Sequence, residues 1–512
     1  MYRILTASKD TYVTNKIINN SFRATDANVG KAASLDLFKL YNESTLSGTS
    51  KPTELTRLLV KFDLNPLRQL TGSFLDISNS SFSCNIRLSD VYGGQTCPSN
   101  FKLLVFPLSK SFDEGIGKDI VKFNDLDSCN FITSSVINSV TPVSWSSPGA
   151  NKEGLLGSSN IDIISSGNLN DGNGIVNLWK SQQFLNGEED FNVDITTVIS
   201  ATLKNIIPDH GFRISFTGSE ETDTVSRFVK RFASVQSSNP FKRPSLIVRF
   251  NDTIQDHHRS FYFNISGSLF LNNFHRGVSR NILSGSSATQ ITGSDSLILR
   301  LTTGSSARGT YFQKIITASQ HKFGQNYMSG VYSASFAVSE WASGTLTNEI
   351  KSSTSATFTE IWESSDGTIG YLTSSIVVNS VNRTSFDNRA RRLLLSVTNA
   401  KSEYRFNDKV RFRVFAENID RPLIAKRLPI ESQSEILISL YYRVRDVDSG
   451  DIVVPFDTAN KGTLCSTDGS GMYFDFYMSS LAKGRLYTLD FLVTDRGVDQ
   501  IFTDVAAKFR VI

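Results

Sequence analysis

Cysteine is scarce in this sequence of 512 residues, which has four: Cys84, Cys97, Cys129 and Cys465. None of them forms a C-x-x-C pair, so a zinc site built on such pairs is not predicted. Cys84 and Cys97 could meet across a hairpin, because turn-forming residues at 92–95 lie between them. So sparse a cysteine set favours reduced thiols, and a disulfide between these two remains the open alternative.

Long apolar runs and concentrated charge of one sign are missing as well. No stretch of about 18 apolar residues occurs, so a membrane-spanning helix is not predicted. Residues 1–13, MYRILTASKDTYV, lack the basic and then apolar regions of a secretory signal. The 53 basic and 49 acidic residues are scattered along the chain, with a formal net charge of +4. Since nucleic-acid binders concentrate basic charge on one face or tail, neither a nucleic acid nor a membrane is an expected partner.

Catalytic motifs are also absent from the sequence. It has five histidines and no G-x-S-x-G elbow, P-loop or G-x-G-x-x-G after a strand. A glycosidase needs two carboxylates about 5–10 Å apart in a cleft, and nothing marks such a pair among the 49 acidic residues. The sequence therefore predicts no catalytic residue, no cofactor and no enzyme activity.

What the sequence does contain favours β-structure. Ser, Thr, Asn and Gly are abundant, and there are 36 Phe residues. Leu58–Phe62 and Phe212–Phe216 alternate apolar and polar side chains, which is the pattern of half-buried strands. The length predicts roughly three domains. We expect an all-β fold with three consecutive β-sandwich domains, at residues 1–251, 256–385 and 386–512.

The first domain is expected to be large, with a long polar segment inside it. Its expected strands lie at 4–5, 11–13, 35–40, 55–62, 82–88, 102–108, 191–195, 212–216 and 244–250. Residues 109–190 are rich in Gly, Ser and Asn, and they are too many for a loop of a compact sandwich. We interpret them as an insertion with a few short elements, among them a helix at Gly174–Phe184.

Six blocks of the first domain combine strand patterns with turn residues: Asp10–Val13, Asp26–Gly30 with its N-x-G turn, Leu58–Leu64, Phe191–Val198, Gly211–Phe216 and Arg227–Phe250. In this order they resemble the DNRLRE family, a β-sandwich module of extracellular and virion surface proteins. The resemblance implies a jelly roll similar to carbohydrate-binding modules. The segment 109–190 departs from the family pattern.

The other two domains also show short strand patterns. In the middle domain these lie at 261–263, 296–301, 330–336, 356–362 and 370–372, and in the last domain at 393–397, 409–415, 436–444, 473–476, 487–493 and 507–512. The last domain's strand number is typical of an immunoglobulin- or fibronectin-like sandwich. Its segment Ser439–Asp457 carries a hairpin signal, two strands around an Asp-Ser-Gly-Asp turn, and resembles C-terminal modules of tailed-phage structural proteins.

Clustered carboxylates give one candidate metal site. Asp446, Asp448 and Asp451 could supply oxygen ligands to Ca²⁺, although their loop lacks EF-hand spacing. Asp residues also favour tight turns by bonding their own backbone, and this is the preferred interpretation. A second acidic set is expected to be a polar loop; its members are Asp113, Glu114, Asp119, Asp125 and Asp127, around Gly115 and Gly117.

Trp145, within the turn-like segment SWSSPG, is the candidate ligand-binding residue. Carbohydrate modules stack exposed aromatic rings on sugar rings, and a turn would expose this side chain. The alternative is a core role, because a Trp in a β-sandwich usually buries roughly 150–250 Å² of surface.

These features together predict a non-enzymatic structural component of a tailed-phage virion, in its tail, neck or baseplate. A virion protein made in the host cytoplasm and released by lysis needs no secretory signal. The expected partners are other virion proteins and further copies of the chain in a symmetric assembly. A tail-fibre adhesin that binds host-surface glycans is the first alternative, and a polysaccharide depolymerase is the second.

Overall fold

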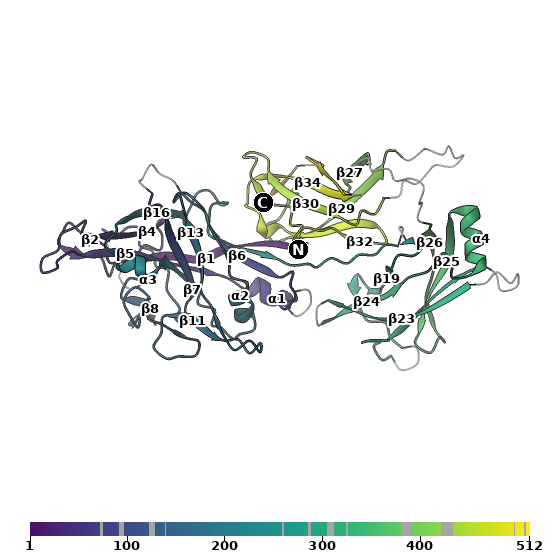
Figure 1. Ribbon diagram of the computed structural model, residues 1–512, viewed down its shortest axis with the longest axis horizontal. Coiled ribbons are helices and arrows are strands. Elements are labelled where there is room, and N and C mark those ends of the chain that lie inside the picture. Colours follow the sequence, from purple (N-terminus) through teal and green to yellow (C-terminus); the bar gives the residue numbers. More distant parts are fainter. Residues whose placement is uncertain are drawn as a thin grey trace. The chain divides into compact units, whose positions relative to one another are not determined.

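The computed structural model describes residues 1–71, 75–91, 97–121, 128–138, 140–258, 261–284, 288–304, 312–323, 326–380, 391–420, 434–495, 497–505 and 508–512. They divide into two compact units, and Figure 1 shows that strands are their main regular structure, with few helices. The N-terminal unit comprises Arg3–Gln69 and Phe82–Arg249, and the C-terminal unit comprises Met1–Tyr2, Leu70–Ser81 and Phe250–Ile512. The predicted all-β fold with several β-sandwich modules is confirmed.

A ten-stranded sheet forms the body of the N-terminal unit. Its strands are β1 (Tyr2–Thr14), β4 (Ser34–Tyr41), β5 (Thr53–Phe62), β6 (Ser83–Leu88), β7 (Phe101–Pro107), β13 (Lys180–Phe184), β14 (Phe191–Asp194), β15 (Phe212–Phe216), β16 (Arg227–Ala233) and β17 (Ser245–Arg249). The order is β13-β7-β15-β5-β1-β17-β6-β14, with β4 pairing to both β5 and β16. Strands expected from alternation, such as Leu58–Phe62, lie in this sheet.

Phenylalanine rings close this sheet upon itself. Strands β13 and β14 stand at opposite ends of the strand order. Phe184 of β13 nevertheless contacts Phe191 of β14, with ring centroids 6.5 Å apart, and stacks on Phe101 of β7 at 4.8 Å. All three side chains are fully buried. Burial of such large apolar rings is a main source of core stability, and here it brings the two sheet edges together.

The regular structure in the described residues of the segment 109–190 consists of short strands, and the helix expected at Gly174–Phe184 is wrong. Its short sheets contain β8 (Thr133–Ile137) with β9 (Thr141–Ser144), and β10 (Glu153–Leu155), β11 (Ile163–Asn168) and β12 (Ile175–Asn177). The last part of the segment is β13, which pairs with β7 over its whole length. Pairing with a strand about 80 residues earlier in the chain overrides the local preference of these residues.

Few helices accompany these strands. The N-terminal unit has α2 (Thr196–Leu203) and α3 (Gly218–Thr222), the segment Asn65–Thr71 forms α1, and the C-terminal unit has α4 (Gly344–Ser353). A small hairpin of β2 (Ile17–Ile18) and β3 (Phe22–Arg23) also belongs to the N-terminal unit. Among the residues placed in the structure, no helix is long and apolar enough to cross a membrane.

A seven-stranded sheet with the order β18-β26-β25-β22-β23-β24-β19 fills residues 261–379 of the C-terminal unit. Its strands are β18 (Phe261–Tyr262), β19 (Gly267–Asn272), β22 (Leu297–Thr303), β23 (Phe312–Phe323), β24 (Asn326–Phe336), β25 (Ser355–Ser364) and β26 (Gly370–Asn379), and a hairpin of β20 (Phe274–His275) and β21 (Val278–Ser279) extends it. The end strands β18 and β19 follow each other in the chain, so this sheet also curls. Trp362 is fully buried in its core.

Residues 393–511 form a sandwich of two packed sheets. One has the order β27-β29-β33-β32, and the other has β28-β36-β34-β30-β31 with β35 beside β34. The strands are β27 (Leu393–Val397), β28 (Glu403–Tyr404), β29 (Lys409–Asn418), β30 (Leu440–Asp446), β31 (Ile452–Val454), β32 (Ser466–Asp468), β33 (Gly471–Tyr477), β34 (Leu486–Asp495), β35 (Val498–Phe502) and β36 (Phe509–Val511). Tyr442 of one sheet stacks on Phe474 of the other with ring centroids 4.1 Å apart. The expected hairpin is confirmed by the antiparallel pair Val444 and Val454.

The three-domain division itself stays a prediction. The N-terminal unit ends at Arg249, next to the expected boundary at residue 251. The curled sheet and the sandwich belong to one compact unit, although each has its own strands.

Candidate functional site

Trp145 is buried, so the expectation that it is an exposed sugar-stacking residue is wrong. Its side chain is 5% exposed and packs in a core cluster with Phe106 and Phe112. The indole Nε1 donates a hydrogen bond to the carbonyl of Asn130 at 3.0 Å. A ring whose faces and polar atom are already in use offers nothing to a ligand.

The loop that follows Trp145 is organised by one buried carboxylate. Asp162 is fully buried and accepts hydrogen bonds from the backbone N–H groups of Ser146, Ser147 and Lys152, at 2.6, 2.9 and 2.9 Å. Several N–H donors stabilise a buried charge that would otherwise be costly. The loop therefore has a fixed backbone, and the polar composition that suggested an exposed turn reflects internal bonding.

Two buried arginines of the main sheet hold the same loop from its carbonyl side. Arg57 on β5 donates to the carbonyl of Gly149 at 2.8 Å, and Arg213 on β15 donates to that of Ala150 at 3.0 Å. Burial and, after it, the nearby Arg57 charge together lower the pKa of Arg213 to about 9. Arg57 is neutralised by Glu221 of α3, with Nη2 and Oε2 2.7 Å apart. Loop, sheet and helix are thus joined through one ionic network.

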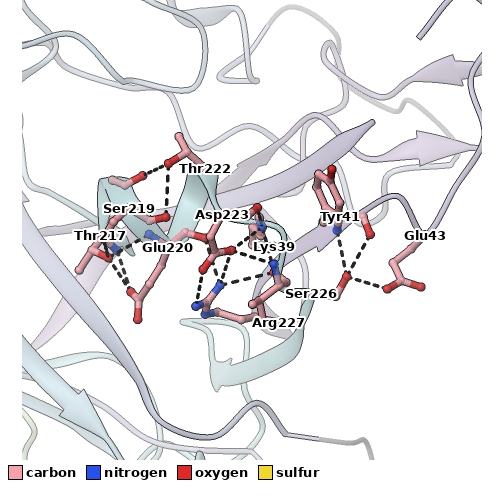
Figure 2. A network of polar contacts seen from close by, with 12 residues as sticks. Lys39, Tyr41, Glu43, Thr217, Ser219, Glu220, Thr222, Asp223, Ser226 and Arg227 are labelled. Atoms are coloured by element: carbon pink, nitrogen blue, oxygen red, sulfur yellow. Dashed lines mark hydrogen bonds and ion pairs between the residues drawn. The ribbon is translucent and has the colours of Figure 1, made fainter. Parts of the chain in front are cut away.

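Figure 2 shows a second network, centred on Asp223 at the C-terminal end of α3. Hydrogen bonds from Arg227, and then from Lys39, hold the pKa of the Asp223 carboxyl well below its ordinary value despite partial burial. The Arg227 Nη2 and Lys39 Nζ atoms both lie 2.8 Å from Asp223 oxygens. Lys39 is fully buried and also donates to the carbonyl of Val225 at 2.9 Å. A capping box of Thr217 and Glu220 begins the helix, so the whole segment is fixed against β4.

The N-x-G turn and part of the second acidic set, separated in the sequence, lie together. Asn28 donates to the carbonyls of Glu114 and Cys129, both at 2.8 Å, and its Oδ1 accepts the N–H of Gly117 at 2.9 Å. Gly115 has a φ of +76°, and a Cβ there would lie 2.4 Å from the Asn28 side chain. Glycine is required by both the backbone conformation and the close approach. Asp125 and Asp127 lie outside the described residues.

A buried carboxyl sits beside this junction. Asp10 of β1 is 1% exposed and accepts the N–H of Val235 at 2.6 Å. Burial raises the pKa of Asp10 to about 7, the Glu114 carboxylate raises it too, and Lys31 acts in the opposite direction. Lys31 forms an ion pair with Glu114. This group is therefore the part of the network whose charge changes near neutral pH.

Of the three candidate metal ligands, Asp446 has its carboxylate oxygens bonded to other groups of the protein. Asp446 is fully buried; its Oδ2 accepts Arg485 Nε at 2.6 Å and its Oδ1 accepts the N–H of Ser449 at 2.8 Å. Asp448 and Asp451 are exposed. Within the described ranges, no three His, Cys, Asp or Glu side chains are grouped so that they could hold a metal ion. Arg485 already compensates the charge that a cation would bind.

The four cysteines are free thiols in the structure. Cys84 is fully buried on β6, and burial raises the pKa of its thiol well above the ordinary value. Cys97 is partly exposed. The turn expected at residues 92–95 falls outside the described residues.

A cavity of about 290 Å³ in the C-terminal unit is the feature that the sequence did not indicate. Aromatic and charged side chains line it; among them are Phe270, Phe274, Phe323, Tyr473, Tyr477, Lys409, Arg411 and Asp475. Arg411 lies 4.1 Å from the Tyr473 ring centre and pairs with Asp475 at 2.7 Å. Because β29 and β33 pair, the alternating charged and aromatic side chains of one strand lie opposite those of the other. This alternation is the sequence pattern from which the cavity wall could have been predicted. The cavity can accept a flat polar ligand against aromatic walls.

Comparisons with known proteins give no family. No protein-family model matches the chain, and no curated protein matches it. Similar solved structures include a titin substructure, at 6% identity over 51% of this chain and 97% of that one, with a TM-score of 0.15. The N-terminal Ig1-2 module of the Drosophila receptor protein tyrosine phosphatase DLAR gives 8% identity, 51% and 96% coverage and a TM-score of 0.14.

Trypsin-activated alpha-2-macroglobulin from Escherichia coli gives 8% identity over 98% of this chain, which spans 31% of that protein, with a TM-score of 0.14. Likenesses at this level carry no argument about function. The resemblance to the DNRLRE family remains a prediction.

Proposed function

We propose that the chain is a non-enzymatic structural component of a tailed-phage virion, associated with its tail, neck or baseplate. The observation that supports this is the ionic locking of the N-terminal unit. There Arg57 and Arg213 of the sheet donate to carbonyls of the long polar segment at 2.8 and 3.0 Å, and Asp162 fixes the same loop from within through hydrogen bonds of 2.6–2.9 Å. A subunit that repeats in a symmetric assembly needs surface loops of one fixed shape, because each loop meets the same partner surface in every copy.

Burying charge is a costly way to fix a loop. A buried ion pair is often no more stabilising than well-packed apolar residues, but breaking one is strongly unfavourable. Networks of this type therefore favour a single backbone arrangement over a flexible one. This suits a protein whose function is to present defined surfaces to neighbours. The proposed partners are other virion proteins and further copies of this chain.

Localisation on intact virions tests the proposal. Cryo-electron microscopy, with a tag on the chain for immunogold labelling, is expected to show ordered copies around the tail, neck or baseplate. Native mass spectrometry of the purified chain is expected to show self-association or binding to one virion protein. Absence of the chain from purified virions would overturn the proposal.

A second candidate function is binding of host-surface glycans, which the aromatic cavity favours. Phe274 is 64% exposed, and such rings stack on the apolar faces of sugars while neighbouring charged groups bond the hydroxyls. A glycan array probed with the purified chain tests this function. Loss of a positive signal in Phe274→Ala, with retention in Phe228→Ala, would place the glycan in the cavity, because Phe228 is 47% exposed on the N-terminal unit. No signal from the unmodified chain would argue against it.

A further inference from the structure

A histidine lies between two buried carboxyl groups where the chain enters the curled sheet. His258 Nδ1 is 3.8 Å from Asp256 Oδ1, and its Nε2 is 3.6 Å from Glu360 Oε2 on β25. The Asp256 side chain is 5% exposed and that of Glu360 is 1% exposed, whereas the imidazole is 26% exposed. The histidine can thus exchange protons with solvent while the carboxyl groups are shielded from it.

The Glu360 carboxylate has few other partners that could stabilise its charge, so its contact with His258 matters for stability. Trp362 Nε1 donates a hydrogen bond to Glu360 Oε1 at 2.6 Å. The other oxygen, Oε2, is buried and has no hydrogen-bond partner among the described residues. The imidazole is its nearby cation when protonated. An ionised carboxylate in such a place is costly without a positive neighbour.

Asp256 is fastened to the sandwich as well. The segment Ile254–Asp256 runs beside β32: Thr467 donates its N–H to the Ile254 carbonyl at 2.9 Å, and its Oγ1 accepts the Asp256 N–H at 2.7 Å. Thr467 Oγ1 also donates to the Asp256 carbonyl at 2.9 Å. The Asp256 carboxyl accepts the His258 N–H at 2.9 Å, which fixes the histidine relative to this strand-like segment. One short stretch therefore carries both the attachment to β32 and the contact with β25.

We propose that Asp256, His258 and Glu360 form a pH-responsive latch that holds residues 254–258 against β32 and β25. Protonated His258 supplies the positive charge for both carboxyl groups, and the latch is closed. When the imidazole loses its proton, the buried carboxylates lose their compensation, and the segment detaches locally from β32. Local opening of this kind needs much less free energy than global unfolding.

The other ionisable groups act in the same direction. Burial raises the pKa of Asp256 to about 6, His258 lowers it, and the Glu360 and Asp468 carboxylates raise it. Because this value lies above the ordinary 3.8, the folded state binds the proton more tightly than the unfolded state does. Its stabilising contribution is complete at low pH and is lost as the pH rises through about 6. Asp256 and His258 both favour the closed latch in mild acid.

Hydrogen exchange of the full chain tests the latch. The amides of Asp256 and Thr467 donate the bonds that hold the segment, so their protection is compared from about pH 5 to about pH 8 after correction for intrinsic exchange. We expect protection to fall by more than about tenfold over this range, since a pKa difference of one unit in a single group already corresponds to a factor of ten. Amides in the core of the sandwich, such as that of Phe474 on β33, are expected to keep theirs.

Two variants and one matched control make the result specific. His258→Gln removes the imidazole, and Glu360→Gln keeps an acceptor for Trp362 while removing the buried charge. Both are expected to show a clearly smaller pH-dependent change than the unmodified chain, because only the part contributed by Asp256 remains. His257→Gln alters the neighbouring histidine, whose pKa is lowered by burial alone, and is expected to behave like the unmodified chain. Unchanged pH dependence in Glu360→Gln, or its loss in His257→Gln, would overturn the proposal.

Discussion

Glu221 in the N-terminal unit and Glu360 in the C-terminal unit are both buried carboxylates, but their cations differ. Glu221 is paired with the guanidinium of Arg57, a permanently cationic type of side chain. Glu360 faces the His258 imidazole, which is a cation only when it is protonated. The chain therefore uses the same buried acid in two ways. One pairing fixes a loop permanently, and the other makes the attachment of a segment depend on pH.

Removal of Arg57, the permanent cation beside Glu221, is expected to have the largest effect. Arg57→Met leaves Glu221 buried without a partner and frees the carbonyl of Gly149. We expect a loss of about 3–5 kcal/mol in the free energy of unfolding, measured by urea denaturation of the N-terminal unit's transition.

Arg87→Met provides the matched control for that variant. Arg87 pairs with Asp190 at 2.9 Å, and the two side chains are 41% and 33% exposed. Solvent screens this pair, so its loss should cost less than about 1 kcal/mol. Equal losses in the two variants would show that burial does not decide the strength of these pairs.

The junction of Asn28 with Gly115 gives the next largest effect. Gly115→Ala places a methyl group against the Asn28 side chain and strains a backbone with φ of +76°. We expect a loss of about 2–4 kcal/mol by thermal denaturation. Gly172→Ala, at φ of +84° with no atom within 4 Å, isolates the backbone strain and should cost about 1 kcal/mol. A similar loss in both would mean that the contact with Asn28 is unimportant.

Asp10 tests whether the N-terminal unit also contains a group whose charge depends on pH, because it lies buried beside the Glu114 and Lys31 ion pair. Its pKa, raised by burial to about 7, lies above the ordinary 3.8, so its contribution to stability falls as the pH rises between these values. Urea denaturation from about pH 4 to about pH 7 should show a slope of up to 1.4 kcal/mol per pH unit from this group. Asp10→Asn should remove that slope. If the stability of Asp10→Asn changes between about pH 4 and about pH 7 by the same amount as that of the unmodified chain, Asp10 is not the group responsible.

The turn after Asp446 should show the smallest effects. Asp448→Asn and Asp451→Asn alter exposed side chains, and each is expected to change stability by less than about 0.5 kcal/mol. Addition of Ca²⁺ is expected to leave the thermal midpoint unchanged, because Arg485 already neutralises Asp446. A calcium-dependent rise that is lost in Asp448→Asn would establish the metal site instead.

Local pattern was sufficient for much of the fold. The alternation of Leu58–Phe62 and Phe212–Phe216 identified strands that pair directly with each other in the main sheet. The turn residues of Ser439–Asp457 identified the hairpin of β30 and β31. Helix α4 could have been found from Ser343, whose Oγ caps it by accepting the N–H of Leu346.

The errors came from partners far away in the chain. Trp145 is buried because Asp162, Arg57 and Arg213 hold its loop, and the local sequence does not reveal that the strands of the last two lie beside this loop. His258 and Glu360 are likewise about 100 residues apart, and their contact follows from the position of β25. Composition indicates which charges exist, whereas their burial and pairing depend on tertiary structure.

The attachment of residues 254–256 to Thr467 has a consequence for how the chain is made. The two bonded residues Asp256 and Thr467 are 211 positions apart. At about 5–20 residues per second, the ribosome finishes the first of them about 10–40 s before the second. During that interval the early segment has an open backbone edge and no strand to receive it. A nascent chain can therefore pair with a neighbouring copy during this interval, which begins soon after the N-terminal unit has been synthesised.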